Sequence, residues 1–185
     1  MITKLLNEVE EKMKHSIDAA KKEFAGVRTG RANPGILDRV MVEYYNTLTP
    51  LNQLGSITVP DARTLLIQPW DKTAINAVEK AILKADLGLN PANDGTVIRI
   101  AIPPLTEERR KELVKLVKKE AEEKRVMVRN LRRDANERIK QMEKDKEISE
   151  DEARRAEDSV QKLTNKYIEQ IDKLLEHKEK EIMEV

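Results

Sequence analysis

Apolar residues recur every three or four positions in three long segments of the chain. The first segment runs from Ile2 to Val27 and ends at the helix-breaking sequence RTGRANPG. The second follows Thr106, and the third follows Ser149. This spacing puts the apolar residues on one face of a helix, so the sequence predicts three long amphipathic helices. Because none of them can bury its apolar face alone, we expect the three to pack together as a bundle.

Two of these helices carry recognisable start signals. Thr106 follows two prolines and precedes two acidic residues, which fits an N-cap with favourable charges in the first turn. Ser149 is followed three residues later by Glu152, the spacing of a capping box. We therefore expect helices to begin directly after Thr106 and Ser149.

The segment between the first two helices has a different texture. It holds short runs rich in β-branched and aromatic residues, bounded by Pro, Gly, Asn and Asp: RVMVEYY, SITV, TLLIQPW and TVIRIAI. Such runs predict strands. Between the third and fourth run, the spacing of apolar residues from Ala74 to Ile82 predicts a short helix, with Gly88 near its C-terminal end and Pro91 preventing its continuation.

The predicted fold class is therefore α+β. Residues 1–30 and 105–185 form a long three-helix bundle, and residues 31–104 form an inserted small β/α/β domain. The chain crosses between the two only at TGRANP and IPPLTE. Two narrow crossings that contain Gly and Pro favour a hinge over a fixed, packed interface. The expected hinge residues are Thr29, Gly30, Arg31, Ala32, Pro103, Pro104 and Leu105.

Charge is distributed unevenly on a chain that is almost neutral. There are 35 basic and 34 acidic residues, and the formal net charge is +1. Residues 106–147 carry 15 basic and 11 acidic side chains, whereas residues 148–185 carry 7 and 11. The second predicted helix is thus a basic stripe, and the distribution is more informative than the total.

Several classes of function lack the residues they need. The chain has no cysteine, and its two histidines, His15 and His177, lie far apart on charged helices. There is no Gly-rich phosphate loop, no metal-ligand spacing and no Ser-His-Asp set, so we expect neither an enzyme nor a bound metal or cofactor. No apolar run approaches a membrane span, and the N-terminus lacks a signal or transit pattern, so a soluble cytoplasmic protein is expected.

The basic stripe contains RVMVRNLRRDANERIK, residues 125–140. Spacings of four, three and four place Arg125, Arg129, Arg132 and Asn136 in one row beside the apolar seam, with Arg133 further around the helix. The planar guanidinium group suits bidentate contacts to phosphate. The alternative is structural, because arginine stems can cover the flank of a bundle and pair with acids of neighbouring helices.

Aromatic residues are only 3% of the chain, and Phe24 and Tyr167 fall on the apolar faces of helices. Readers of single-stranded RNA need exposed aromatic side chains on which bases can stack. If the chain binds RNA, we therefore expect it to recognise phosphate and shape on a structured RNA.

The sequence resembles the bacterial ribosome recycling factors along essentially its whole length. The matching segments, in order, are VRTGRANP, VEYY, TPLNQL, DARTL, EKAI, DLGLNP, IPPLTEERRKELVK, VRNLRRDAN, DKEISEDEARRAED and QKLT. Many relatives have glycine after the two tyrosines, where this chain has Asn46. Asparagine tolerates the left-handed backbone region better than most residues, so a turn can survive there.

The resemblance implies an L-shaped, monomeric protein that binds the ribosome after termination. It implies that the bundle lies against ribosomal RNA of the large subunit, and that the small domain faces elongation factor G and the small subunit. GTP hydrolysis by elongation factor G would then help to split and recycle the ribosome. Arg129, Arg132 and Arg133 match the family's RNA-contacting arginines, Arg125 lies in the same row, and Arg28 and Arg31 fall in the matching RTGR motif.

Two functions from different classes remain open. One is a translation factor that binds ribosomal RNA and is moved by a GTPase partner. The other is a helical scaffold or adaptor whose charged faces bind proteins. Preference for ribosomes emptied of nascent peptide would distinguish them, because a scaffold has no reason to show it.

Overall fold

The computed structural model describes residues 1–184 and contains two compact units. The first unit consists of Met1–Phe24 and Lys115–Glu179, and the second consists of Ala25–Val114 together with the chain from Lys180 on. This division falls inside long helices. The domain limits at residues 30/31 and 104/105 follow the change from helical to strand-like sequence, and they stay a prediction.

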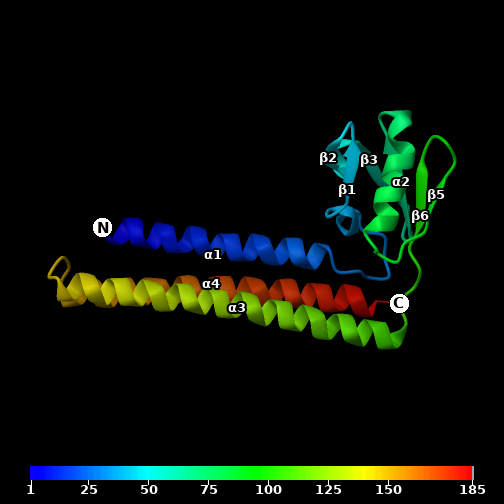
Figure 1. Ribbon diagram of the computed structural model, residues 1–185. Coiled ribbons are helices and arrows are strands. Elements are labelled where there is room, and N and C mark those ends of the chain that lie inside the picture. The colour runs from blue at the N-terminus through cyan, green and yellow to red at the C-terminus, as the bar shows by residue number, and fades with distance from the viewer. Residues whose placement is uncertain (185) are drawn as a thin grey trace. The chain divides into compact units, whose positions relative to one another are not determined.

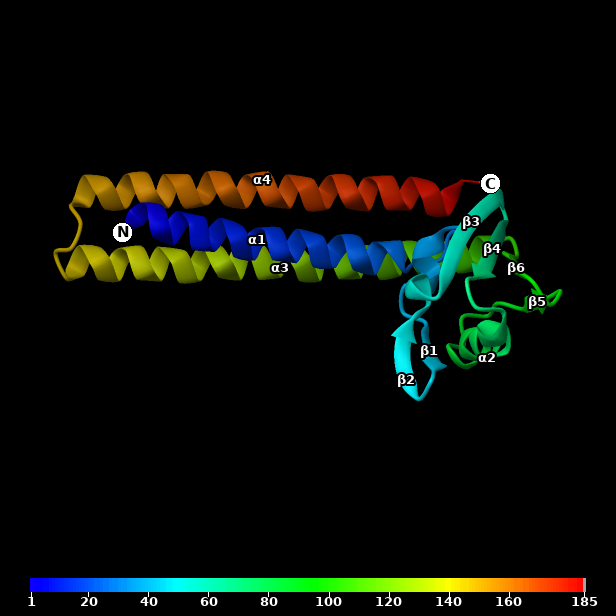
Figure 2. The same ribbon diagram turned by 90° about the horizontal axis from the view of Figure 1, so that it is seen from above.

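Three long helices account for the first unit, as the apolar periodicity predicts. They are α1 (Ile2–Ala25), α3 (Glu107–Lys144) and α4 (Glu150–Met183), which run side by side in both views (Figures 1 and 2). Each buries its apolar stripe. The stripes include Leu5, Val9, Met13, Ile17 and Phe24 of α1, Val117, Ala121, Val128, Ala135 and Ile139 of α3, and Val160, Tyr167 and Ile171 of α4.

The predicted starts of α3 and α4 are confirmed by their caps. The Thr106 hydroxyl accepts a hydrogen bond from the Arg109 amide at 3.1 Å. The Ser149 hydroxyl accepts one from the Glu152 amide, also at 3.1 Å. Each bond satisfies one of the backbone donors that a helix start leaves unpaired.

A charged residue interrupts the apolar stripe of α3, and the structure shows how it is accommodated. The side chain of Lys124 is only 9% exposed, and its Nζ atom lies 2.9 Å from Glu23 Oε1 on α1. An ammonium group buried in this way needs such a partner, since leaving it unpaired is costly. Lys124 thus joins α1 to α3 within the bundle.

The second unit contains the predicted small β/α/β domain. Its main sheet is antiparallel in the order β3-β4-β6-β5, formed by β3 (Gly55–Asp61), β4 (Thr64–Pro69), β6 (Ile98–Ala101) and β5 (Pro91–Asn93). A separate hairpin pairs β1 (Met41–Tyr44) with β2 (Thr47–Pro50). The helix α2 (Ile75–Lys84) lies beside β1 (Figure 2). Short 3₁₀ helices occupy Pro34–Leu37, Leu51–Gln53 and Lys72–Ala74.

Every second side chain along β4 and β6 is buried, and these side chains help to form the core of this unit. In β6, Ile98 and Ile100 are fully buried, whereas Arg99 and Ala101 are exposed. The buried side chains of the strands contact those of α2 and those of the segment before β1, and together they form one cluster. It includes Ile36, Leu37, Val40, Val42, Leu51, Leu65, Ile67, Val78, Ile82, Ile98, Ile100 and Ile102.

Two strands and one helix end differ from the expectation. β2 and β5 carry no run of alternating apolar residues, so their sequences gave no strand signal. α2 ends at Lys84, and Asp86 takes the left-handed conformation with φ 50°. Gly88, with φ 69°, therefore lies in the loop after the helix and not at its end.

The hairpin turn shows how the chain accommodates Asn46 after the two tyrosines. Tyr45 and Asn46 are the two central residues between the paired Tyr44 and Thr47, and both have positive φ, 49° and 62°. A two-residue turn with both φ values positive matches the twist of the strands. Asn46 is among the residues that adopt this conformation most readily, so the expected turn is confirmed.

A hydrogen bond anchors β1 next to α2. The Tyr44 hydroxyl donates to Asp71 Oδ2 at 2.6 Å, and Asp71 Oδ1 accepts from the Thr73 amide at 2.9 Å. The bond to Asp71 stabilises the neutral phenol, so it raises the pKa of Tyr44 to about 12. The contact depends on the phenol proton.

We expect a tyrosine transition near pH 12 by ultraviolet difference spectroscopy. Burial also raises the pKa of Tyr167, so the transition is assigned to Tyr44 by its loss in Tyr44→Phe. The folded pKa lies above the unfolded value, so the bond contributes stability below pH 10 and loses it between pH 10 and about 12. Tyr45→Phe is the matched control, because within residues 1–184 its hydroxyl makes no hydrogen bond to a carboxylate. Loss of the transition in Tyr45→Phe instead would contradict the assignment.

Candidate nucleic-acid interface

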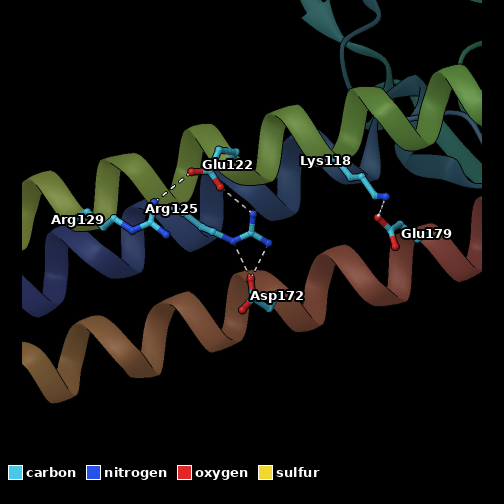
Figure 3. Close-up of polar contacts among 6 residues, drawn as sticks. All are labelled: Lys118, Glu122, Arg125, Arg129, Asp172 and Glu179. Carbon is cyan, nitrogen blue, oxygen red and sulfur yellow. Dashed lines mark hydrogen bonds and ion pairs between the residues drawn. The ribbon is translucent and has the colours of Figure 1, made fainter.

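The arginine row of α3 lies in the first unit, and its members differ in what they contact. Arg125 is the least exposed of those in ion pairs, with 18% of its side chain accessible. Its Nε donates to Asp172 Oδ1 of α4 at 2.7 Å, and its Nη1 donates to Glu122 Oε2 at 3.1 Å (Figure 3). Burial alone would lower the pKa of Arg125, but the hydrogen bonds to these two carboxylates outweigh it and raise the pKa. Arg125 thus ties α3 to α4.

Arg129 shares the same acid. Its Nη1 donates to Glu122 Oε1 at 3.1 Å, so one carboxylate bridges two arginines (Figure 3). The hydrogen bonds from Arg125 and then Arg129 hold the pKa of Glu122 below its usual value. Arg129 remains 44% exposed. Its charge is therefore only partly compensated, by an acid that already serves another partner.

Arg132 and Arg133 are not neutralised by any acid of residues 1–184. Arg132 Nη1 donates to Gln161 Oε1 of α4 at 3.1 Å, and this partner is uncharged. Arg133 is exposed and makes no polar contact within the same residues. A neutral acceptor can orient a guanidinium without removing its charge, so both groups keep their full attraction for an anion.

The two arginines of the RTGR motif belong to the second unit. Arg28 is half-buried, and its Nη2 donates to the Pro103 carbonyl at 3.4 Å. Burial, and then the nearby charge of Arg109, lower the pKa of Arg28. Arg31 is exposed, with its Nη2 3.1 Å from Glu184 Oε2. Arg28 therefore fastens the two crossings together, and Arg31 is the more accessible of the pair.

The residues expected to form a hinge also belong to the second unit. The Ala32 amide donates to the Ala62 carbonyl at 2.7 Å, and the Ile102 amide donates to the Arg63 carbonyl at 2.7 Å. Both crossings are thus held by the same turn between β3 and β4. Between these anchors and the helices, a Cβ atom added to Gly30 would meet nothing within 4 Å.

The sequence did not reveal which arginines are compensated. Glu122 precedes Arg125 by three residues and Arg129 by seven, a spacing that places all three on one side of a helix. That signal could have identified the local acid. Asp172 and Gln161 come from α4, and their pairing with Arg125 and Arg132 depends on the register of two helices, which periodicity alone does not determine.

Two findings on residues 1–184 concern metal binding and membranes. These residues contain no group of three or more His, Cys, Asp or Glu side chains that could hold a metal ion. Across the same range, every helix is too short or too polar to cross a membrane.

Comparisons with known proteins agree closely with one another. The model of the family described as "Ribosome recycling factor" matches residues 20–183. The chain is 59% identical to the ribosome-recycling factor of Carboxydothermus hydrogenoformans and 60% identical to that of Bacillus licheniformis, in both cases over the full length of both proteins.

Solved structures give the same answer. One is a solution structure of ribosome recycling factor, 50% identical, with a TM-score of 0.82 over all of this chain and 98% of the other. A second is 48% identical, with a TM-score of 0.72 over the whole of both chains. Its description names the Thermus thermophilus ribosome recycling factor and Escherichia coli elongation factor G bound to the Escherichia coli post-termination complex.

Proposed function

Since the chain belongs to the ribosome recycling factor family, we propose that it binds the post-termination ribosome and, with elongation factor G and GTP, promotes ribosome splitting and recycling. The family match over the full chain carries this proposal. The related factor described together with elongation factor G on the post-termination complex supports the choice of partners. The protein would act in the cytoplasm as a monomeric translation factor, with no chemistry of its own.

Within this function, we assign the contact with ribosomal RNA to Arg129, Arg132 and Arg133. Arg132 and Arg133 carry charges that no acid among the described residues 1–184 compensates, and Arg129 would exchange its share of Glu122 for phosphate. Arg125 is a positioning residue, because its guanidinium is already occupied by two carboxylates. Arg31 is the better candidate for an additional RNA contact than Arg28, whose group is half-buried against Pro103.

The function is tested by following ribosome splitting through light scattering, with the chain, elongation factor G and GTP added together or one at a time. We expect splitting only with the complete set, on ribosomes whose nascent peptide has been released by puromycin. Binding to such ribosomes without splitting would contradict the recycling function while keeping the RNA interface. Binding that ignores the state of the ribosome would favour a protein scaffold.

We also propose that the two crossings act as a hinge. The crossings at 29–32 and 103–105 are each anchored to the β3–β4 turn at one end, so motion would concentrate in the few residues beyond the anchors. Pro103 and Pro104 restrict the backbone of one crossing. The two prolines would limit the directions in which this hinge can move, so that a push from a GTPase partner turns the small domain along a defined path.

We therefore expect the double variant Pro103→Gly, Pro104→Gly to bind ribosomes normally but split them several-fold more slowly in the light-scattering assay. Its arginine row is untouched, and glycine removes the restriction on φ. Pro50→Gly is the control, since Pro50 lies in β2, outside both crossings and outside the β3–β4 turn that anchors them. Splitting at the normal rate in the double variant would show that the crossing transmits no motion.

A further inference from the structure

We propose that a cleft between β1 and α2 is a docking site for an acidic, amphipathic helix of a protein partner. The cleft has a volume of about 840 Å³ and lies entirely within the second unit. It is thus built from different elements than the arginine row of α3. Both ribbon views show α2 next to β1 (Figures 1 and 2).

The two walls follow from the periods of a strand and a helix. Along β1 and its ends, Arg39, Met41, Glu43 and Tyr45 line the cleft at alternate positions, and the buried Val40 also borders it. Between them, Val42 is fully buried in the core, which fixes the face that the alternating residues present.

The opposite wall is one stripe of α2 and the turn before it. The lining residues recur at steps of three, one and three, the spacing of a single helical face: Thr73, Asn76, Ala77, Lys80, Ala81 and Lys84. From Thr73 to Lys84 this stripe extends roughly 16 Å at 1.5 Å per residue. That length matches about three turns of a docked helix.

Apolar side chains line this cleft while remaining accessible to solvent. Met41 is 44% exposed, Tyr45 78% and Leu48 66%. Single exposed apolar residues are ordinary, but several gathered in one concave surface indicate an interface. The apolar face of an amphipathic helix would cover all three.

The charged residues that line the cleft indicate which charge the bound partner should carry. Three cations line it, Arg39, Lys80 and Lys84, against the one acid Glu43. Within residues 1–184 none of the four takes part in an ion pair. Uncompensated cations around apolar side chains complement a helix with leucine-like residues on one face and carboxylates on its flanks.

Nucleic acid fits this surface less well. Tyr45 is the one aromatic residue that lines the cleft, so a series of bases would lack stacking partners. Met41 and Leu48 would face a polar sugar-phosphate backbone without gain, whereas they can pack against the apolar face of a helix. The observations therefore favour a protein segment over a single strand.

The test uses the full chain labelled with ¹⁵N and three probes of defined chemistry. The first is a fluorescent helical peptide of about 14 residues, roughly four turns, with leucine on one face and glutamate elsewhere. The second replaces every glutamate with lysine, and the third is an oligouridylate of similar length. We expect the acidic peptide alone to bind, with amide shifts confined to residues 39–48 and 73–85.

Matched variants distinguish binding in the cleft from non-specific electrostatic attraction of the peptide to the protein surface. Lys80→Glu should weaken binding of the acidic peptide at least about tenfold, a difference of about 1.4 kcal/mol. Lys72→Glu changes an exposed lysine that does not itself line the cleft, so it should weaken binding clearly less than Lys80→Glu does. Met41→Ser should weaken binding more than Val59→Ser, although the two side chains are similarly exposed, 44% and 41%.

Three results would overturn the proposal. The first is an equal loss of affinity for the acidic peptide in Lys72→Glu and Lys80→Glu. The second is that the lysine peptide binds as tightly as the acidic peptide. The third is that the oligouridylate binds at the same residues more tightly than the acidic peptide does. The last result would identify the cleft as a nucleic-acid site. Amide spectra of each variant without peptide verify that the second unit is folded.

Discussion

Arg132→Ala is expected to lower the affinity for post-termination ribosomes at least about tenfold while leaving the bundle folded. The Arg132 guanidinium is held by a neutral glutamine and by no acid of residues 1–184, so its charge is available to phosphate. A charge-assisted hydrogen bond contributes about 1.5–3 kcal/mol, which is the expected loss of binding free energy. The free energy of unfolding should change by less than about 0.5 kcal/mol, as for other surface substitutions.

Arg138→Ala is the matched control for this experiment. It removes the same charge from the same helix, but Arg138 already pairs with Glu8 at 3.2 Å. Co-sedimentation with ribosomes at several salt concentrations measures both variants. If Arg132 binds phosphate, its loss should also reduce the slope of log affinity against log salt by about one unit. Equal affinities for the two variants, or a drop in melting temperature in Arg132→Ala alone, would make Arg132 a structural residue.

The second large effect concerns stability. Glu23→Ala should lower the free energy of unfolding by about 2–4 kcal/mol, because it leaves the ammonium of Lys124 buried without its partner. This loss is smaller than the one expected on breaking a fully buried ion pair, because 32% of the Glu23 side chain is exposed to solvent. Urea unfolding followed by circular dichroism would measure the change.

A control and a rescue make the interpretation specific. Glu8→Ala removes a carboxylate from α1 as well, but its pair with Arg138 is exposed, so the loss should stay within about 1 kcal/mol. Adding Lys124→Met to Glu23→Ala should restore most of the stability, since an apolar side chain of similar length no longer needs a counterion. Similar losses in Glu8→Ala and Glu23→Ala would show that burial of Lys124 is unimportant.

The long helices were predictable from sequence because their apolar residues keep the helical period over many turns. The caps at Thr106 and Ser149 were predictable because each depends on residues within three positions. β2 and β5 were missed because backbone pairing with a neighbour, and not their own apolar pattern, makes them strands.

The candidate site was predictable only in part. The spacing of Arg125, Arg129 and Arg132 on one face required nothing but the helical period. Their different surroundings arise from α4, where Asp172 meets Arg125 and Gln161 meets Arg132. Such pairings join residues 29 and 47 positions apart, and a single sequence carries no signal for them. The partners, and not the arginines themselves, determine which guanidinium groups remain available.

The two amides that fasten Ala32 and Ile102 to the adjacent carbonyls of Ala62 and Arg63 bring the ends of the intervening segment together. A segment whose ends already meet costs its host little chain entropy, whatever its length. Residues 33–101 can therefore be regarded as an insertion between α1 and α3. A linker of a few flexible residues could replace this insertion and still connect the two helices. Because its ends lie together, the same segment could also be closed into a circle, or be inserted as one unit into a loop of another protein.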